Sequence, residues 1–97
     1  MTNLVDIISA SISDHWCMAR VGNKKYDSYI RALSVDRHYD GKAFIKLFCY
    51  YPKTGKIELA QISKIDHLFA LRLAKDMSED LERRLNTMYA KYLLVNE

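Results

Sequence analysis

The residues best suited to acid–base chemistry lie together in the middle of the chain, at Asp36, His38 and Asp40. A histidine flanked by carboxylates can titrate near neutral pH and exchange a proton with a substrate. Asp40 is followed by Gly41, a pair typical of a tight β-turn, so we expect the three side chains at an exposed hairpin tip. Because water reaches such a tip freely, we interpret these three residues as turn-forming and solubilising, and not as a proton-transfer site. The sequence therefore predicts no catalytic residue and no enzyme.

Soft metal ligands are present, but they are spaced too widely for a metal site. The candidates are His15, Cys17, His38, Cys49 and His67. Structural zinc sites use four ligands, which usually come in closely spaced pairs such as Cys-x-x-Cys. We therefore predict no metal and no other cofactor. Two distant cysteines also fall short of the disulfide framework of a small secreted protein, which favours a cytoplasmic location.

Residues that could bind a charged partner are concentrated in residues 24–56. The chain of 97 residues has 15 Lys and Arg against 12 Asp and Glu, a net charge of +3. Residues 24–56 alone hold eight bases and three acids, a local charge of +5. Such a patch attracts an acidic protein surface or a polyanion, although it is less dense than the basic clusters of a dedicated duplex binder.

Residues 41–48 are partly similar to the central-strand motif of RNA-recognition domains, in which aromatic side chains on an open sheet stack on bases. Four residues follow that motif in order: Gly41, Ala43, Phe44 and Ile45. Lys42 and Leu47 stand where the motif has stacking aromatics, and the repeated strand-helix-strand unit of that family is missing. The chain is not assigned to the family. A nucleic-acid-binding protein with a basic and aromatic sheet face is the alternative function.

The N-terminal segment has apolar residues at three- and four-residue steps, the spacing of an amphipathic helix. They are Leu4, Ile7, Ile8, Ile12, His15, Trp16 and Ala19. We therefore expect a helix over residues 3–20, ended by Gly22. A competing interpretation ends the helix near Asp14 and makes residues 16–21 a first strand, followed by a two-residue turn at Gly22 and Asn23.

A first predicted hairpin turns at residues 40–41. If this turn has two residues, Leu33 lies opposite Phe48 and Arg31 lies opposite Tyr50. Apolar and basic residues alternate along both strands. We therefore expect basic residues and aromatic rings to share one face of the sheet.

A second predicted hairpin turns at residues 52–55, a Pro-Lys-Thr-Gly loop. A four-residue loop there pairs Phe48 with Leu59 and Leu47 with Ala60. Both faces of the resulting sheet are substantially apolar. Each face must therefore be covered by helices of this chain or by another chain.

The C-terminal third predicts two helices. Ser63 followed by Asp66 is a capping box, which predicts a helix over about residues 64–76. A second cap signature at Ser78 starts a further helix, about residues 78–94. A single helix of about thirty residues is the alternative.

The expected fold is therefore α+β, in a single compact domain over residues 1–97. It has an N-terminal helix, a three-stranded antiparallel meander, and two C-terminal helices. A fourth strand is added if residues 16–21 are extended. No apolar run approaches the roughly 18 residues that a membrane helix needs, so we expect no membrane partner.

The favoured function is a non-enzymatic protein-binding module, a small inhibitor or regulator that docks on a larger protein complex such as a nucleic-acid-processing one. A homodimer is a second arrangement that the apolar C-terminal end permits. The residues predicted to steer a partner by charge are Arg31, Arg37, Lys42, Lys46 and Lys53. The residues predicted to anchor it are Tyr50, Tyr89 and Tyr92.

Overall fold

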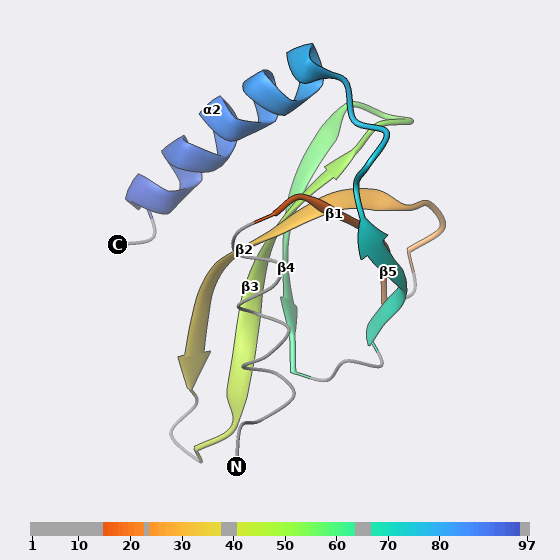
Figure 1. Ribbon diagram of the computed structural model, residues 1–97. Coiled ribbons are helices and arrows are strands. Elements are labelled where there is room, and N and C mark those ends of the chain that lie inside the picture. Colours follow the sequence, from red (N-terminus) through yellow and green to blue (C-terminus); the bar gives the residue numbers. More distant parts are fainter. Residues whose placement is uncertain (1–14, 23, 38–40, 64–66, 96–97) are drawn as a thin grey trace.

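The computed structural model of the chain describes residues 15–22, 24–37, 41–63 and 67–95. Over these residues the protein has an antiparallel sheet and a helix, an α+β arrangement (Figure 1). The elements are β1 (Cys17–Val21), β2 (Ser28–Arg37), β3 (Ala43–Tyr51), β4 (Lys56–Ile62), β5 (Leu68–Leu73) and α2 (Glu79–Val95). Within the same residues, no helix is both long and apolar enough to cross a membrane.

The strand order in the sheet is β4-β3-β2-β1-β5, and every neighbouring pair is antiparallel. Strands β1 to β4 form a meander, whereas β5 returns across the sheet to pair with β1. The predicted three-stranded meander with an N-terminal helix and two C-terminal helices is therefore wrong. The segments on either side of the expected meander supply two additional strands.

Residues 17–21 form strand β1 at the place where the end of the N-terminal helix was predicted. Cys17, Ala19 and Val21 are buried and alternate with more exposed residues, which is the period of a strand. The strand is paired on both sides, with β2 and with β5, and this pairing outweighs the helical spacing. The competing interpretation, a first strand, is correct here. Residues 1–14 lie outside the described residues.

Gly22 ends β1 in the left-handed region, with φ of +57°, a conformation that glycine adopts at low cost. Its N–H donates a hydrogen bond of 2.7 Å to the carbonyl of His67, just before β5. Strand β2 begins at Ser28, so the connection is longer than the two-residue turn of the competing interpretation.

Residues 68–73 form strand β5, and the predicted helix over 64–76 is wrong. Leucine and alanine favour a helix locally, but propensity is a weak guide when tertiary pairing is available. Here the segment pairs with β1, and Val21 lies opposite Leu68. Asp66, half of the predicted capping box, lies outside the described residues.

Helix α2 confirms the predicted helix over 78–94 to within one residue at each end. Ser78 caps it as predicted: its side-chain oxygen accepts a hydrogen bond of 3.2 Å from the N–H of Leu81. Its carbonyl accepts another, of 2.9 Å, from the N–H of Glu82. Three acidic residues in the first turn also suit the positive end of the helix dipole.

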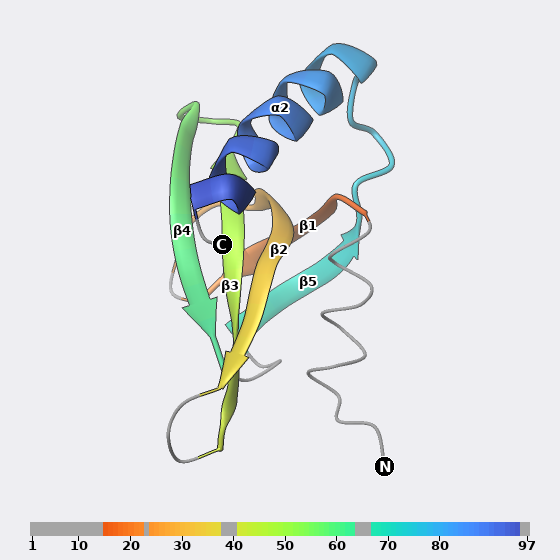
Figure 2. The same cartoon turned by 90° about the vertical axis from the view of Figure 1, so that its left-hand side faces the viewer.

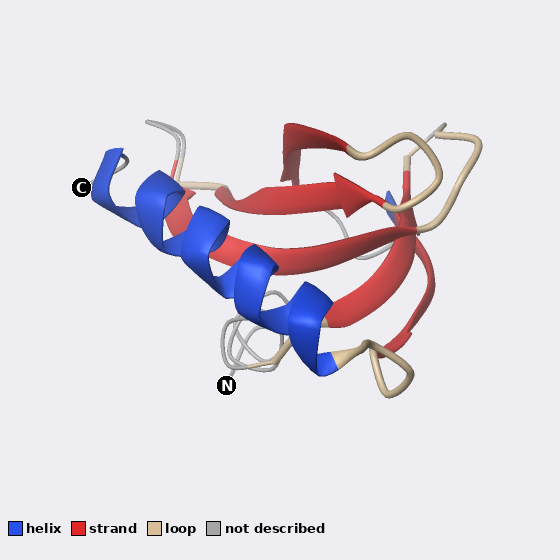
Figure 3. Cartoon of the chain, turned by 90° about the horizontal axis from the view of Figure 1, so that it is seen from above, coloured by secondary structure: helices blue, strands red, loops and turns tan. Residues whose placement is uncertain are grey.

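The sheet is curved, and β1 and β5 run at an angle to β3 and β4 (Figure 2 and Figure 3). One face encloses a set of buried residues that we call the inner cluster. Its members are Cys17, Ala19, Val21, Ile30, Ala32, Ile45, Leu47, Cys49, Tyr51, Ile62 and Leu68. Ile62 and Leu68 come from opposite ends of the sheet, so the strands wrap around this cluster.

The opposite face of the sheet lies under α2 (Figure 1). The buried residues between helix and sheet, which we call the helix-covered cluster, are Trp16, Leu33, Phe48, Leu85 and Tyr89. The apolar stripe of α2 thus covers the aromatic face of the hairpins. Both sheet faces have a core of residues from this chain.

The second predicted hairpin is confirmed. Phe48 lies opposite Leu59 and Leu47 lies opposite Ala60, as the four-residue loop requires. Gly55 closes the loop with φ of +72°, which favours glycine at that position. The four-residue turn at residues 52–55 therefore determines the register of β3 and β4.

The first predicted hairpin has a different register. Phe48 lies opposite Arg31, not Leu33. The register already differs by one residue next to the turn, where Asp36 lies opposite Phe44, and it shifts by one more between Ala32 and Ser34. Such a shift is a β-bulge, which inserts an extra residue in one strand and bends it. The predicted pairs of this hairpin are therefore wrong.

Candidate functional site

Strand β5 ends the described sheet and pairs on one side, with β1. Its first residue, Leu68, is buried, and the residues after it are exposed. The exposed fractions of Phe69, Leu71 and Leu73 are 44%, 37% and 50%. Proteins usually protect an edge strand with charges or cover, because its free backbone groups can pair with another chain. The free edge of β5 is therefore a candidate binding surface.

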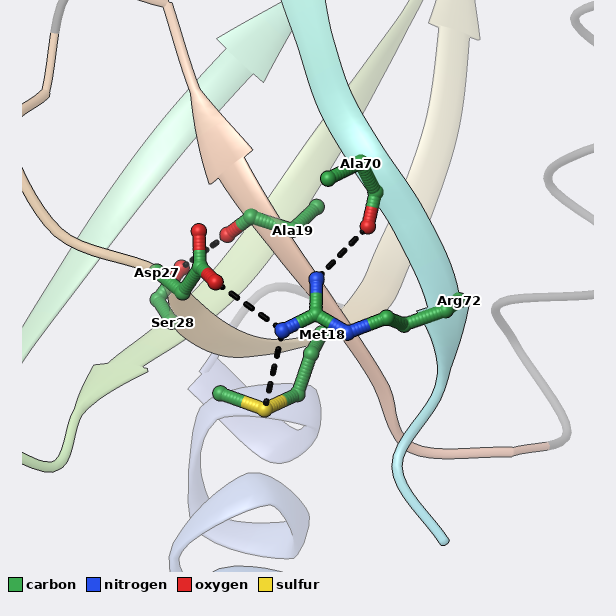
Figure 4. Close-up of polar contacts among 6 residues, drawn as sticks. All are labelled: Met18, Ala19, Asp27, Ser28, Ala70 and Arg72. Carbon is green, nitrogen blue, oxygen red and sulfur yellow. Dashed lines mark hydrogen bonds and ion pairs between the residues drawn. The ribbon is translucent and has the colours of Figure 1, made fainter.

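Arg72 braces β5 against the rest of the sheet (Figure 4). Its guanidinium lies 2.9 Å from the carboxylate of Asp27 and donates a hydrogen bond of 2.7 Å to the carbonyl of Ala70. It also lies 3.9 Å from the sulfur of Met18 in β1. Ala70 has φ of +56°, an uncommon value for a residue other than glycine. The arginine thus holds an unusual backbone bend in the middle of the strand.

Two hollows lie beside the end of β5 and share Leu73, Ala74 and Lys75 in their walls. The first has a volume of about 260 Å³ and is also lined by His15, Trp16, Arg31, Met77, Glu82 and Asn86. The second has a volume of about 530 Å³ and is also lined by Met18, Tyr29, Arg72 and Asp76. The surface next to the apolar strand is therefore hollowed, and side chains of a bound segment can enter it.

Arg31, a predicted steering residue, lies where α2 meets the sheet. The centre of its guanidinium is 4.7 Å from the ring centre of Tyr89 and 5.7 Å from that of Trp16. It donates a hydrogen bond of 3.3 Å to the side chain of Asn86, which also accepts one of 2.7 Å from Trp16. Each cation–π contact is worth about 0.5–2 kcal/mol. Arg31 therefore helps to hold α2 in place, and its steering role stays a prediction.

The three predicted anchor tyrosines also pack within the fold. Tyr89 is 8% exposed, and its hydroxyl donates a hydrogen bond to the carbonyl of Ala32. The ring of Tyr92 lies 5.4 Å from that of Phe48, edge to face. Tyr50 stacks at 6.4 Å on the tyrosine opposite it in β2. These contacts serve the helix-covered cluster, and anchoring of a partner stays a prediction.

The other predicted steering residues are spread along β3 and beyond both of its ends. Lys42 precedes β3 and Arg37 is the last residue of β2, so both lie at the turn end of the first hairpin. Lys46 lies 3.9 Å from the carboxylate of Asp36. Lys53 lies in the turn between β3 and β4, at the other end of β3. The structure therefore does not gather the predicted basic residues into one patch.

The sheet face predicted for base stacking is the face under α2. Phe48 is fully buried there and Tyr50 is half-buried. Base stacking on these rings would require α2 to move away from the sheet. The alternative function on this face thus stays a prediction.

Cys17 and Cys49 are free thiols in the inner cluster. Burial raises the pKa of both, that of Cys49 to about 12, because a thiolate would lose its hydration. A thiol that stays protonated is a weak nucleophile. In the part of the chain that the structure describes, no three His, Cys, Asp or Glu side chains gather as metal ligands. His38 and Asp40 of the predicted acid–base cluster lie outside it.

The exposed apolar residues of β5 were not among the predicted site residues, because the segment was predicted to be a helix. A signal was present in residues 67–75, which contain two bases, no acid, no glycine and no proline. An apolar segment with low charge and no breaker is the kind that pairs with another strand. The helical propensity of leucine and alanine concealed it.

No protein-family model, curated protein or solved structure matches the chain.

Proposed function

We propose that this protein is a non-enzymatic protein-binding module that takes up an extended segment of a larger protein along the free edge of β5. One observation carries the proposal: β5 ends the described sheet and exposes Phe69, Leu71 and Leu73. A segment laid beside β5 would cover these side chains and pair with backbone groups on the outer side of the strand, except the carbonyls of Ala70 and Leu73, which already accept hydrogen bonds from Arg72 and Lys75. A module that holds a strand of a larger complex would inhibit or regulate that complex.

Side-chain burial would supply part of the binding free energy. Complete burial of a large apolar side chain is worth about 1.5–3 kcal/mol, so covering the exposed parts of these three contributes about 3 kcal/mol in total. Association costs at least about 4 kcal/mol in lost freedom. Backbone hydrogen bonds and the neighbouring hollows must contribute as well. We therefore expect the bound segment to continue past Leu73 toward Lys75.

The charges around β5 indicate which segment fits. Residues 67–75 hold Arg72 and Lys75 and no acid, and the guanidinium of Arg20 lies 5.1 Å from the ring centre of Phe69. Arg72 already has a carboxylate partner, whereas Lys75 has no ion pair with the described residues. A segment that alternates apolar with acidic residues would cover the apolar side chains of β5 and place a carboxylate near Lys75.

A matched pair of variants, Leu71→Lys and Leu59→Lys, tests the proposal. Both place lysine at an exposed leucine of an end strand, in β5 and in β4, and Leu59 is 53% exposed. A protein captured by the wild-type chain is purified, and its affinity for each variant is measured by calorimetry. We expect Leu71→Lys to weaken binding about tenfold or more, and Leu59→Lys to change it less than about twofold.

Hydrogen exchange provides a backbone readout that side-chain substitutions cannot give. Amides of β5 should exchange more slowly in the complex than in the free chain, because strand addition pairs them. Unchanged exchange in β5, or equal loss of affinity in both variants, would contradict the proposal. A dimer in light scattering that Leu71→Lys returns to a monomer would assign the edge to a second copy and overturn the partner-segment proposal.

We place this module in the cytoplasm. Its two cysteines are free and buried, and unpaired thiols fit a reducing compartment. Fractionation of cells that express the tagged chain checks this location.

A further inference from the structure

A second surface lies where the connection between β1 and β2 meets the turn between β3 and β4. A hollow of about 260 Å³ opens there. Its walls are formed by Lys24, Lys25, Tyr26, Tyr51, Thr54, Lys56 and Glu58. None of these residues belongs to β5 or to the hollows beside it, so this surface is independent of the function proposed above.

The charges at this hollow are mostly uncompensated. The ammonium of Lys24 lies 2.9 Å from the carboxylate of Glu58, and this hydrogen bond raises the pKa of Lys24. Lys25 and Lys56 have no ion pair with any described residue, and neither has Lys53 in the adjoining turn. These three positive charges, on the β1–β2 connection, the β3–β4 turn and the first residue of β4, repel one another, and a bound anion would relieve that repulsion.

An aromatic ring stands among these lysines. Tyr26 is 40% exposed, and the ammonium of Lys53 lies 5.3 Å from its ring centre. Tyr51, which is 7% exposed, forms part of the apolar wall behind it. Exposed rings combined with lysines are how proteins bind single-stranded nucleic acid, because the rings stack on bases and the cations follow the backbone.

We propose that this hollow binds the phosphate backbone of single-stranded nucleic acid, with a base stacked on the ring of Tyr26. Lys25, Lys53 and Lys56 are the phosphate contacts. The hollow is smaller than the pockets of drug-sized ligands, about 300–1,000 Å³, so it fits one unit of a strand that runs across the surface. A duplex would call for a larger basic face. An acidic peptide would be attracted by the same lysines but would not depend on an aromatic ring.

Fluorescence anisotropy with a labelled oligothymidylate tests the proposal on the full chain at several salt concentrations. The variants are Lys25→Ala, Lys56→Ala and Tyr26→Leu, all at exposed residues. Lys91→Ala is the matched control, because Lys91 is an exposed lysine on α2, outside the hollow. The thermal midpoint of each variant verifies that it is folded.

The experiment should distinguish the contribution of the lysines from that of the tyrosine ring. Lys25→Ala and Lys56→Ala should each reduce the slope of log affinity against log salt by about 0.7, the value for one phosphate contact of a single strand. Tyr26→Leu should weaken binding about fivefold or more and leave the slope unchanged. Lys91→Ala should alter neither quantity.

Three results would overturn the proposal. The first is an absence of binding at low salt. The second is an equal loss of affinity in Lys91→Ala and in the variants of the hollow, which would indicate diffuse attraction. The third is displacement of the oligonucleotide by polyglutamate together with unchanged affinity in Tyr26→Leu, which would assign the lysines to an acidic protein.

Discussion

Replacing Tyr89 by phenylalanine removes one hydroxyl from the interface between α2 and the sheet. That hydroxyl donates a hydrogen bond to the carbonyl of Ala32, at the bulge in β2. Both residues are buried, with exposed fractions of 8% and 2%. A buried acceptor that loses its donor costs about 1–3 kcal/mol. We therefore expect Tyr89→Phe to lower the free energy of unfolding by about 1–3 kcal/mol, a large part of the 5–15 kcal/mol of a typical domain.

Urea unfolding followed by circular dichroism measures this loss. The urea midpoint should fall with the slope unchanged, and the thermal midpoint should drop by about 4–8 °C for each kcal/mol. Tyr50→Phe is the control: it makes the same chemical change at a half-buried tyrosine whose hydroxyl has no hydrogen bond to a described residue. It should change stability by less than about 0.5 kcal/mol.

Equal stabilities of Tyr89→Phe and the wild-type chain would refute the reasoning. That result would mean that the hydroxyl contributes nothing to the packing of α2 on the sheet. The ring of Tyr89, packed against Phe48 and Trp16, would then be the part of this side chain that holds the helix.

Two further predictions concern the backbone of β5 and the inner cluster. Ala70→Gly should raise the thermal midpoint, because φ of +56° costs alanine about 1–2 kcal/mol and the flexibility of glycine offsets only about half of that; a lower midpoint would show that the bend is unstrained. The pKa of Cys49 is about 12 in the folded protein against an ordinary 9.0. Above pH 9 the thiol therefore loses its proton on unfolding, and the free energy of unfolding should fall between pH 9 and 12. The fall should be less steep in Cys49→Ala. Urea midpoints that change in parallel with pH in the two proteins would contradict this.

Local chemistry allowed part of the fold to be predicted. The loop at 52–55 fixed the register of β3 and β4, because a tight turn ties each residue to one partner. Ser78 determined the start of α2, because a capping side chain bonds to the backbone within the first turn of the helix. Both predictions depend on residues close in the sequence.

The remaining errors come from interactions between distant residues. Residues 68–73 are apolar and leucine-rich, and they fit a helix or a strand equally well until β1 is known to be available. No glycine marks the bulge at Leu33, which displaced the register of the first hairpin by one residue in addition to the one-residue difference already present next to the turn. The candidate surface on β5 could not be predicted, because it exists only once β5 has been placed at the end of the sheet.

The return of β5 to β1 also sets the order in which the sheet can assemble. Cys17 and Leu73 are partners across the sheet but are separated by most of the described chain, so their contact closes a long loop. Hairpins β2–β3 and β3–β4 can form as soon as their strands leave the ribosome. The outer edge of β1 stays unpaired until β5 has been synthesised. During that interval the nascent chain lacks Leu68 of the inner cluster, and the outer backbone edge of β1 is open to pairing with another chain.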